Sequence, residues 1–262
     1  MHMPQDFLRP HLLTLPIHRV MIRSIEARLF AELAPELPEP IVDIGSGDGT
    51  FVQIALPGRQ IFGIDPLLAD TREALARGAY AGLSVANGRA LPFPDASFAS
   101  AISNCVLEHV VPLDETLAET ARVLRPGGLF VASVVGNRFP KELLGTWVLD
   151  RFGLDGARYG NWFNKISAHV NTLSREGWAE RFSRAGFTVM SVRPYLSAAA
   201  LKLFDLSHYY GAPSLLTRRL TGRWLLAPPL TPNLLWEPLL RRIYEAPPDD
   251  DGPYYFFVLR KA

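Results

Sequence analysis

Glycine recurs at every second position directly after a short apolar run, in the segment Val42-Asp43-Ile44-Gly45-Ser46-Gly47-Asp48-Gly49. Because glycine lacks a Cβ atom, such a loop lets the backbone approach a ligand closely. The apolar run is typical of a strand, and a helical pattern follows the loop at 50–56. In open α/β sheets, ligands bind beyond the carboxyl ends of the strands, where the winding direction reverses. The loop therefore predicts a site for a nucleotide-like molecule.

Short apolar runs alternate with helical patterns from residue 41 onward, which indicates β-α units and a parallel sheet. We expect strands over 41–44, 61–64, 83–85, 98–103, 129–135 and 187–192, and an aromatic strand over 254–260. We expect helices over 50–56, 67–77 and 113–124, and a further helix that Ser174 caps and Gly186 ends. Upstream, apolar side chains at helical spacing predict an amphipathic helix over 16–33, which nearby prolines end.

Two long stretches depart from this rhythm, one after the fifth strand and one after the sixth. The second is rich in proline, so we expect helical pieces joined by fixed turns. We therefore divide the chain into an N-terminal helix with its linker, a core, a first insertion, a core helix with its strand, a second insertion that forms a lid, and a terminal strand. These segments cover residues 1–40, 41–135, 136–173, 174–192, 193–253 and 254–262.

The second predicted strand ends in Asp65, whose carboxylate can accept hydrogen bonds from both hydroxyls of a ribose. Together with the glycine loop, this residue predicts a nucleoside site. The dinucleotide pattern G-x-G-x-x-G would require glycine where this chain has Thr50. Asp43 is poorly suited to a neighbouring pyrophosphate, but it suits the cationic ammonium of an amino-acid nucleoside. The residues thus favour a sulfonium amino-acid nucleoside over a dinucleotide.

The chain resembles the class I S-adenosylmethionine-dependent methyltransferases, in their broad small-molecule group. Five blocks of the family occur in the family's order, and they span residues 42–49, 63–66, 87–95, 104–110 and 122–128. The resemblance implies an α/β, Rossmann-like sheet of seven strands that is mostly parallel, with helical insertions that form a lid. In this family the last strand is antiparallel and lies between the fifth and sixth strands, and residues 254–260 would supply it.

The resemblance also implies S-adenosylmethionine as cofactor and assigns roles to residues. The loop would line the methionine part of the cofactor, with Asp43, Gly45, Ser46, Gly47 and Gly49. Asp65, followed by Pro66 in the same block, would hold the ribose. Asn87 and Gly88 would meet the adenine edge, although Asn87 stands where the family usually has Asp; its amide oxygen can still accept a hydrogen bond from the adenine amino group. Asn104 and Val106 would lie beside the transferred methyl group.

Methyl transfer from a sulfonium is an in-line displacement, so the protein mainly aligns the partners and excludes water. A hydroxyl acceptor can also require a base. His109, Glu108 and His169 are our candidates for catalysis, and a neutral imidazole is suited to this role near neutral pH. The alternatives are a structural hydrogen bond for His109 and a loop or core position for His169. No Cys/His cluster or carboxylate pair has metal-ligand spacing, so we expect no metal.

The expected acceptor is a small organic molecule. A net charge of +1 creates no general attraction for nucleic acid, and the N/D-P-P-Y block of base-modifying enzymes is absent. All five tryptophans follow Phe139, so we expect both insertions to wall an apolar acceptor pocket. Five arginines of the second insertion alternate with Leu, Trp and Pro, and they either contact an anionic membrane or face water on a lid. They are Arg218, Arg219, Arg223, Arg241 and Arg242.

We therefore expect a methyltransferase that acts on an oxygen, and less readily on a nitrogen or carbon, of a small-molecule, sugar or lipid-linked acceptor. A nicotinamide-dependent oxidoreductase and a non-catalytic nucleoside-binding scaffold are the alternatives. The lone Cys105 and the absence of a secretion signal favour the cytoplasm. The sequence leaves the oligomeric state open.

Overall fold

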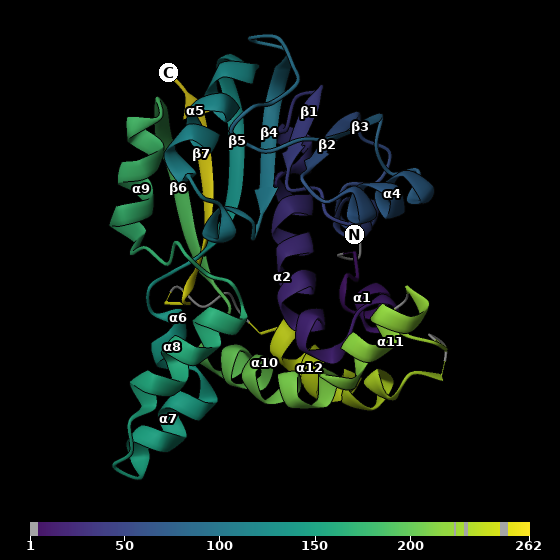
Figure 1. The fold of residues 1–262 in the computed structure, drawn as a ribbon, viewed down its shortest axis with the longest axis vertical. Coiled ribbons are helices and arrows are strands. Elements are labelled where there is room, and N and C mark those ends of the chain that lie inside the picture. Colours follow the sequence, from purple (N-terminus) through teal and green to yellow (C-terminus); the bar gives the residue numbers. More distant parts are fainter. Residues whose placement is uncertain (1–4, 223, 228–229, 247–250) are drawn as a thin grey trace.

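The computed structural model describes residues 5–222, 224–227, 230–246 and 251–262. Its strands form one sheet in the order β3-β2-β1-β4-β5-β7-β6, in which β7 is antiparallel to both neighbours (Figure 1). The strands are β1 (Ile41–Ile44), β2 (Ile61–Asp65), β3 (Gly82–Val85), β4 (Phe98–Asn104), β5 (Leu124–Val135), β6 (Phe187–Tyr195) and β7 (Tyr254–Lys261). This order confirms the expected Rossmann-like fold, including the terminal strand between the fifth and sixth strands.

The helices of the core are those that the periodicity predicts, within a few residues. They are α2 (Ile17–Leu33), α3 (Thr50–Ala55), α4 (Leu68–Arg77), α5 (Leu113–Val123) and α9 (Arg175–Arg184), with short turns η1 (Ala34–Glu36) and η2 (Leu107–His109). Ser174 caps α9 as expected, because its hydroxyl accepts a hydrogen bond from the N–H of Gly177 at 3.1 Å. A helix that the sequence analysis did not predict, α1 (Leu8–Thr14), precedes α2.

Alternating side chains of the strands divide the core into two layers. Ile41 of β1 packs with α2 and α3 on one face of the sheet, whereas Val42 and Ile44 pack with α5 and α9 on the other. This alternation follows from the period of two in a strand. Both faces of the central strands are therefore buried, which is typical of parallel sheets.

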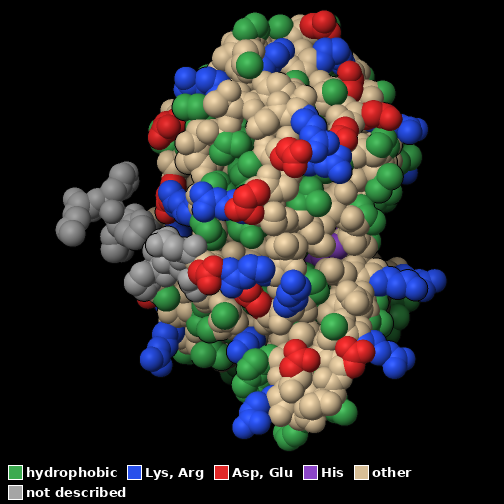
Figure 2. All heavy atoms as spheres, turned by 90° about the vertical axis from the view of Figure 1, so that its left-hand side faces the viewer, with side chains coloured by type: hydrophobic (Ala, Val, Ile, Leu, Met, Phe, Trp, Pro, Cys, Tyr) green, Lys and Arg blue, Asp and Glu red, His purple; other side chains and the backbone are tan. Residues whose placement is uncertain are grey.

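The two insertions are helical. The first contains α6 (Phe139–Glu142), α7 (Leu144–Arg151) and α8 (Gly156–Ile166), and the second contains α10 (Ala198–Gly211), α11 (Pro213–Thr221), η4 (Pro232–Trp236) and α12 (Glu237–Tyr244). Figure 1 shows both insertions gathered beyond one end of the strands, with α2 running from the sheet to α10. The molecule narrows between these two parts, and a histidine side chain is visible at the narrowing (Figure 2).

Strand β5 begins earlier than predicted. The segment Arg125-Pro126-Gly127-Gly128, which precedes the strand expected over 129–135, lies within this strand. Phe98 already pairs with Leu124, and a register shift follows before Ser100, so the strand accommodates the irregular segment as a bulge. The helices in the described part of the chain include none with the length and hydropathy of a membrane span.

Candidate active site

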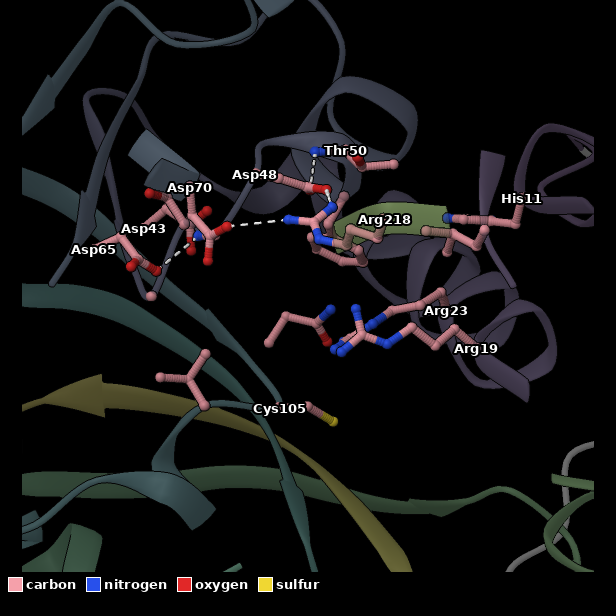
Figure 3. Close-up of a pocket in the computed structure, with 17 residues that line it drawn as sticks. His11, Arg19, Arg23, Asp43, Asp48, Thr50, Asp65, Asp70, Cys105 and Arg218 are labelled. Carbon is pink, nitrogen blue, oxygen red and sulfur yellow. Dashed lines mark hydrogen bonds and ion pairs between the residues drawn. The ribbon is translucent and has the colours of Figure 1, made fainter. Parts of the chain in front are cut away.

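The carboxyl ends of β1, β2 and β4 border a cavity of about 240 Å³. Acidic side chains lie on one side of this first cavity, and Arg19, Arg23 and Arg218 face them from α2 and α11 (Figure 3). The residues expected to bind a cofactor that line it are Asp43, Gly45, Ser46, Gly47, Asp65, Asn104 and Val106. The parallel strands thus bring residues from three separate sequence blocks to one edge of the sheet.

The glycine loop comes directly after β1 and packs against the end of β2. Gly45 has φ = +86°, in the left-handed region, and a Cβ at this position would overlap with the methyl groups of Val106. The N–H groups of Gly45 and Ser46 both donate to the carbonyl of Ile64, at 2.8 and 2.9 Å. The hydroxyl of Ser46 is buried and has no hydrogen-bond partner among the described residues, so it is available to a ligand. Gly49 does not line the cavity but precedes α3 and packs against Ala74.

Asp65 connects the end of β2 to the loop. One carboxylate oxygen accepts a hydrogen bond from the N–H of Leu67 at 2.8 Å, and the other accepts one from the N–H of Gly47 at 2.9 Å. A carboxylate has about four lone-pair sites, so further donors can bind. The residue is buried and also lines the neighbouring cavity. This arrangement gives a fixed acceptor for two vicinal hydroxyl groups.

Asp43 is a buried acid at the base of the first cavity. Its carboxylate accepts a hydrogen bond from the Tyr80 hydroxyl at 2.8 Å. Burial raises the pKa of Asp43 to about 7, because desolvation disfavours the ionised form; the charge of Asp65 adds to this effect and the Tyr80 bond opposes it. A cationic ligand group in the cavity would favour ionisation of this acid.

A second cavity, of about 380 Å³, lies on the other side of Asp65. It shares Gly45, Asp65 and Val106 with the first, and it is mainly apolar. Its other lining residues include Pro66, Leu67, Ala86, Asn87, Gly88, His109, Val110 and Val111. The structure therefore places the predicted adenine-side residues together in an apolar slot beside the loop.

The arginine side chains of the first cavity differ in their charge partners. Arg218 forms ion pairs with Asp48, Asp70 and Glu73, at 3.2 to 3.6 Å. Arg19 forms no ion pair with a carboxylate of the described residues. Its guanidinium instead lies 5.0 Å from the centre of the Trp224 ring, which Arg218 contacts as well, at 4.7 Å.

The third arginine belongs to a buried network below the cavity. Arg23 donates to Glu26 at 2.6 Å, and Glu26 is fully buried. The Cys105 thiol and the Tyr195 hydroxyl both donate to the other Glu26 oxygen, each at 2.9 Å. Since a buried charge requires partners, these bonds explain how α2 carries a carboxylate into the core. The network fixes Arg23 at the cavity wall.

His11 is another residue of the first cavity that the sequence analysis missed. Its Nδ1 lies 2.7 Å from the carbonyl of Phe7, so Nδ1 carries the proton and Nε2 has the free lone pair. Burial lowers the pKa of His11 to about 4, and Nε2 is buried without a partner among the described residues. The ring is therefore neutral near pH 7 and can accept a hydrogen bond.

The predicted catalytic residues lie together but away from the first cavity. His109 lines the second cavity, and its ring centre is 5.2 Å from that of His169. Glu108 is buried beside them. Neither Glu108 nor His169 lines either cavity. Burial raises the pKa of Glu108 to about 8, whereas partial burial and the neighbouring His109 lower that of His169 to about 4.

Trp178 lies in neither insertion: it is buried on α9, and its Nε1 donates to the carbonyl of Val135 at 2.9 Å. One expectation about the insertions needs correction. Arg218 belongs to the cavity rather than to a water-facing or membrane-facing surface. Of the other arginines of the second insertion, Arg241 forms ion pairs, Arg219 and Arg242 are exposed, and Arg223 lies outside the described residues.

Sequence comparison gives the family. Residues 17–192, more than half of the chain, match a family model described as a methyltransferase domain. A malonyl-[acyl-carrier protein] O-methyltransferase from Xylella fastidiosa (strain M23) is 31% identical over 127 residues, which are 45% of this chain and 43% of that protein. An enzyme of the same name from Pseudescherichia vulneris is 25% identical over 229 residues, 84% of this chain and 89% of that protein. The chain thus spans less than half of the first of these relatives.

Solved structures agree with the fold. The geranyl diphosphate C-methyltransferase from Streptomyces coelicolor A3(2), in complex with Mg²⁺, geranyl diphosphate and S-adenosyl-L-homocysteine, superposes with a TM-score of 0.57 at 16% identity. The superposition covers 91% of this chain and 77% of that one. The strand order with an antiparallel β7 agrees with this fold, and, by the match to the family model, the chain belongs to the class I S-adenosylmethionine-dependent methyltransferases.

Proposed function

We propose that this chain transfers the methyl group of S-adenosylmethionine to an oxygen atom of a small-molecule, sugar or lipid-linked acceptor with an apolar part. The observation that carries the proposal is the position of Trp224, which lines an apolar groove and whose ring contacts Arg19 and Arg218 of the first cavity. Two relatives that are named O-methyltransferases support oxygen as the acceptor atom. When bound, the cofactor supplies a methyl group that its sulfonium already activates.

Two cavities that share Gly45, Asp65 and Val106 support a site for the cofactor. The apolar slot around Asn87 and Gly88 would hold the adenine, and Asp65, next to Pro66, would accept hydrogen bonds from the ribose hydroxyls. Asp43 would face the ammonium group, and the loop from Gly45 to Gly49 would bring its backbone against the methionine part. Asn104 and Val106 line the same cavity and would flank the methyl group. The Ser46 hydroxyl supports this placement, because a buried hydroxyl without a hydrogen-bond partner is rare.

Charge balance supports Arg19 as the partner of the cofactor carboxylate. Glu26 neutralises Arg23, and three carboxylates surround Arg218. Arg19 alone among these three arginines forms no ion pair with a described carboxylate, and it lines the first cavity. A carboxylate ligand is the group that an Arg fork binds best.

The acceptor would enter through the groove beside Trp224. This groove has a volume of about 340 Å³ and is mainly apolar, with lining residues that include Pro16, Ile17, Tyr210, Trp224, Leu226 and Leu230. Both arginines that flank the Trp224 ring also line the first cavity, so the groove and the cavity adjoin. An apolar acceptor body in the groove would place its polar end at the cavity.

His11 would receive the hydrogen bond of an acceptor hydroxyl. Its free Nε2 is the buried, unpartnered imidazole nitrogen of the first cavity, whereas the predicted bases Glu108 and His169 line neither cavity. Because alignment supplies most of the rate in methyl transfer from a sulfonium, a weakly basic imidazole is sufficient to orient the hydroxyl.

The peripheral membrane contact remains a prediction for the second insertion. Helix α11 exposes Leu215, Leu216 and Leu220 next to Arg219, a pattern that suits an anionic surface. Cosedimentation with anionic vesicles at low salt tests it. A protein that stays in the supernatant with anionic and neutral vesicles alike would contradict the prediction.

The acceptor atom can be measured directly. Purified protein is incubated with S-adenosylmethionine that carries a carbon-13 methyl group and with fractions of a metabolite extract that are separated by polarity. We expect label in an apolar fraction, and a carbon chemical shift typical of methyl bound to oxygen. A shift typical of an N-methyl or C-methyl group would refute oxygen as the acceptor atom. Label confined to the most polar fractions would refute the groove beside Trp224 as the binding site of an apolar acceptor.

A further inference from the structure

Glu108, His109 and His169 form a cluster that the proposed methyl transfer does not use. Each offers one ligand atom, and these atoms all lie within 4.8 Å of one another. Glu108 and His109 belong to η2, directly after β4, whereas His169 follows α8 in the first insertion. Because the two segments are far apart in the chain, the sequence spacing gave no sign of this juxtaposition.

Backbone hydrogen bonds hold the two segments in place. The carbonyl of Glu108 accepts from the N–H groups of Val170 and Asn171, at 2.8 and 3.0 Å. The Asn171 side chain donates to the carbonyls of Leu107 and Val110, at 2.9 and 2.7 Å. These four bonds join η2 to the segment that follows His169, so the two parts of the cluster are held together.

Each ring has a hydrogen-bond partner at Nδ1, as metal-binding histidines commonly do. The Nδ1 of His109 lies 3.0 Å from the carbonyl of Ala168, and the Nδ1 of His169 lies 3.2 Å from Oδ1 of Asn164. Since a carbonyl oxygen only accepts, each Nδ1 carries the proton and each Nε2 keeps its lone pair. Second hydrogen bonds of this type fix the tautomer and ring orientation of metal ligands.

Glu108 provides the second observation. Its side chain is 1% exposed, and its Oε2 atom has no hydrogen-bond partner among the described residues. A buried carboxylate oxygen without a partner is costly, and a cation is one of the groups that can satisfy it. The histidine pair does not supply that bond in the structure.

We propose that Glu108, His109 and His169 bind a divalent transition-metal ion of the zinc type. Two imidazole nitrogens and one carboxylate oxygen are a donor set that Zn²⁺ and Co²⁺ accept, with a further position for water. The ion would join the end of β4 to the first insertion and fix His109, which lines the apolar slot. Metal binding can be tested without knowledge of the acceptor or of the cofactor position.

Cobalt(II) titration of untagged protein tests the site, because the visible absorption of Co²⁺ reports its ligands. We expect one equivalent to bind and Zn²⁺ to displace it. The variants Glu108→Gln and His169→Gln remove one ligand each with little change in shape. Even outer-shell partners change metal affinity by roughly 10- to 100-fold, so each variant should weaken binding by at least that much.

His208→Gln is the matched control. His208 and His18 form another close histidine pair, with ring centres 4.3 Å apart, but they are not part of such a ligand group. We expect the control to bind Co²⁺ like the unaltered protein. The proposal is overturned if the folded, unaltered protein binds no equivalent of Co²⁺, or if Glu108→Gln binds it as tightly. Should His169→Gln fail to fold, the nearly isosteric Glu108→Gln still decides.

Discussion

Substitution of Asp65 by Asn should weaken both the glycine loop and cofactor binding. The carboxylate accepts one backbone hydrogen bond at each oxygen, from Gly47 and from Leu67. An amide replaces one of these oxygens by a donor, which then faces a backbone N–H. Loss of a hydrogen bond to a charged group costs about 1.5–3 kcal/mol. At about 2–4 °C per kcal/mol for a chain of this size class, we expect Tm to fall by roughly 3–12 °C.

The effect on ligand affinity follows from the same carboxylate. If it accepts from the ribose hydroxyls, loss of its charge removes about 1.5–3 kcal/mol of binding free energy, and each 1.4 kcal/mol is about tenfold. Calorimetry with S-adenosylhomocysteine should therefore show a Kd roughly 10- to 100-fold higher for Asp65→Asn. The measurement must be made well below the lowered Tm, so that only folded protein is titrated.

Asp70→Asn is the matched control for this experiment. Asp70 lines the same cavity, but it pairs with Arg218 at 3.2 Å and does not contact the glycine loop. We expect its Kd to stay within about threefold of the unaltered value, since a partly exposed ion pair contributes little. Equal Kd values for Asp65→Asn and the unaltered protein would refute the ribose assignment. An equal loss of affinity in Asp65→Asn and Asp70→Asn would indicate a general effect of negative charge in the cavity instead of a contact with the ribose.

Three further substitutions test the site. Gly45→Ala should lower Tm more than Gly58→Ala, because both glycines have positive φ but only Gly45 lacks room for a Cβ; equal losses in thermal unfolding would contradict this. Arg19→Ala should raise the Kd of S-adenosylhomocysteine about tenfold in calorimetry, and the exposed Arg219→Ala should not. The Asp43 acid, with its pKa near 7, is protonated at lower pH, whereas the ligand ammonium favours the ionised acid. Affinity should therefore rise about tenfold from pH 6 to pH 8 and lose this dependence in Asp43→Asn; a flat profile in the unaltered protein would exclude the contact.

The sheet and the loop were predictable because their signals are local. A strand that is buried on both faces is an apolar run, and Gly45 and Asp65 each follow such a run directly. Their meeting at one edge then follows from the parallel arrangement alone. Even the irregular start of β5 required only a shifted boundary, since Pro and Gly mark the bulge as well as the helix end.

The opposite wall of the cavity was not predictable in this way. Arg19 and Arg23 lie one helical turn apart on α2, and their spacing shows a polar face without showing what it faces. Glu26 belongs to the same helix but is fully buried, because Cys105 and Tyr195 from distant segments complete its hydrogen bonds. The signal that was available is the i, i+4 pair of arginines on an otherwise apolar helix.

Contacts between residues far apart in the sequence also explain the other differences between the predicted and the observed site. In the sequence, Arg218 stands between Thr217 and Arg219 and looks like the other arginines of the second insertion, yet its ion pairs are with residues of the first half of the chain. His109 and His169 were proposed separately as bases, and only the tertiary structure shows them as one cluster with Glu108. Trp178 shows the reverse case, since its local helix already assigns it to the core.

A crystal structure of the protein with S-adenosylhomocysteine tests the cofactor site most directly. We predict the ribose hydroxyls within hydrogen-bond distance of the Asp65 carboxylate, the adenine in the slot beside Asn87, and the carboxylate of the ligand against Arg19. A ligand bound with its ribose away from Asp65, or with its adenine in the groove beside Trp224, would contradict the proposed site.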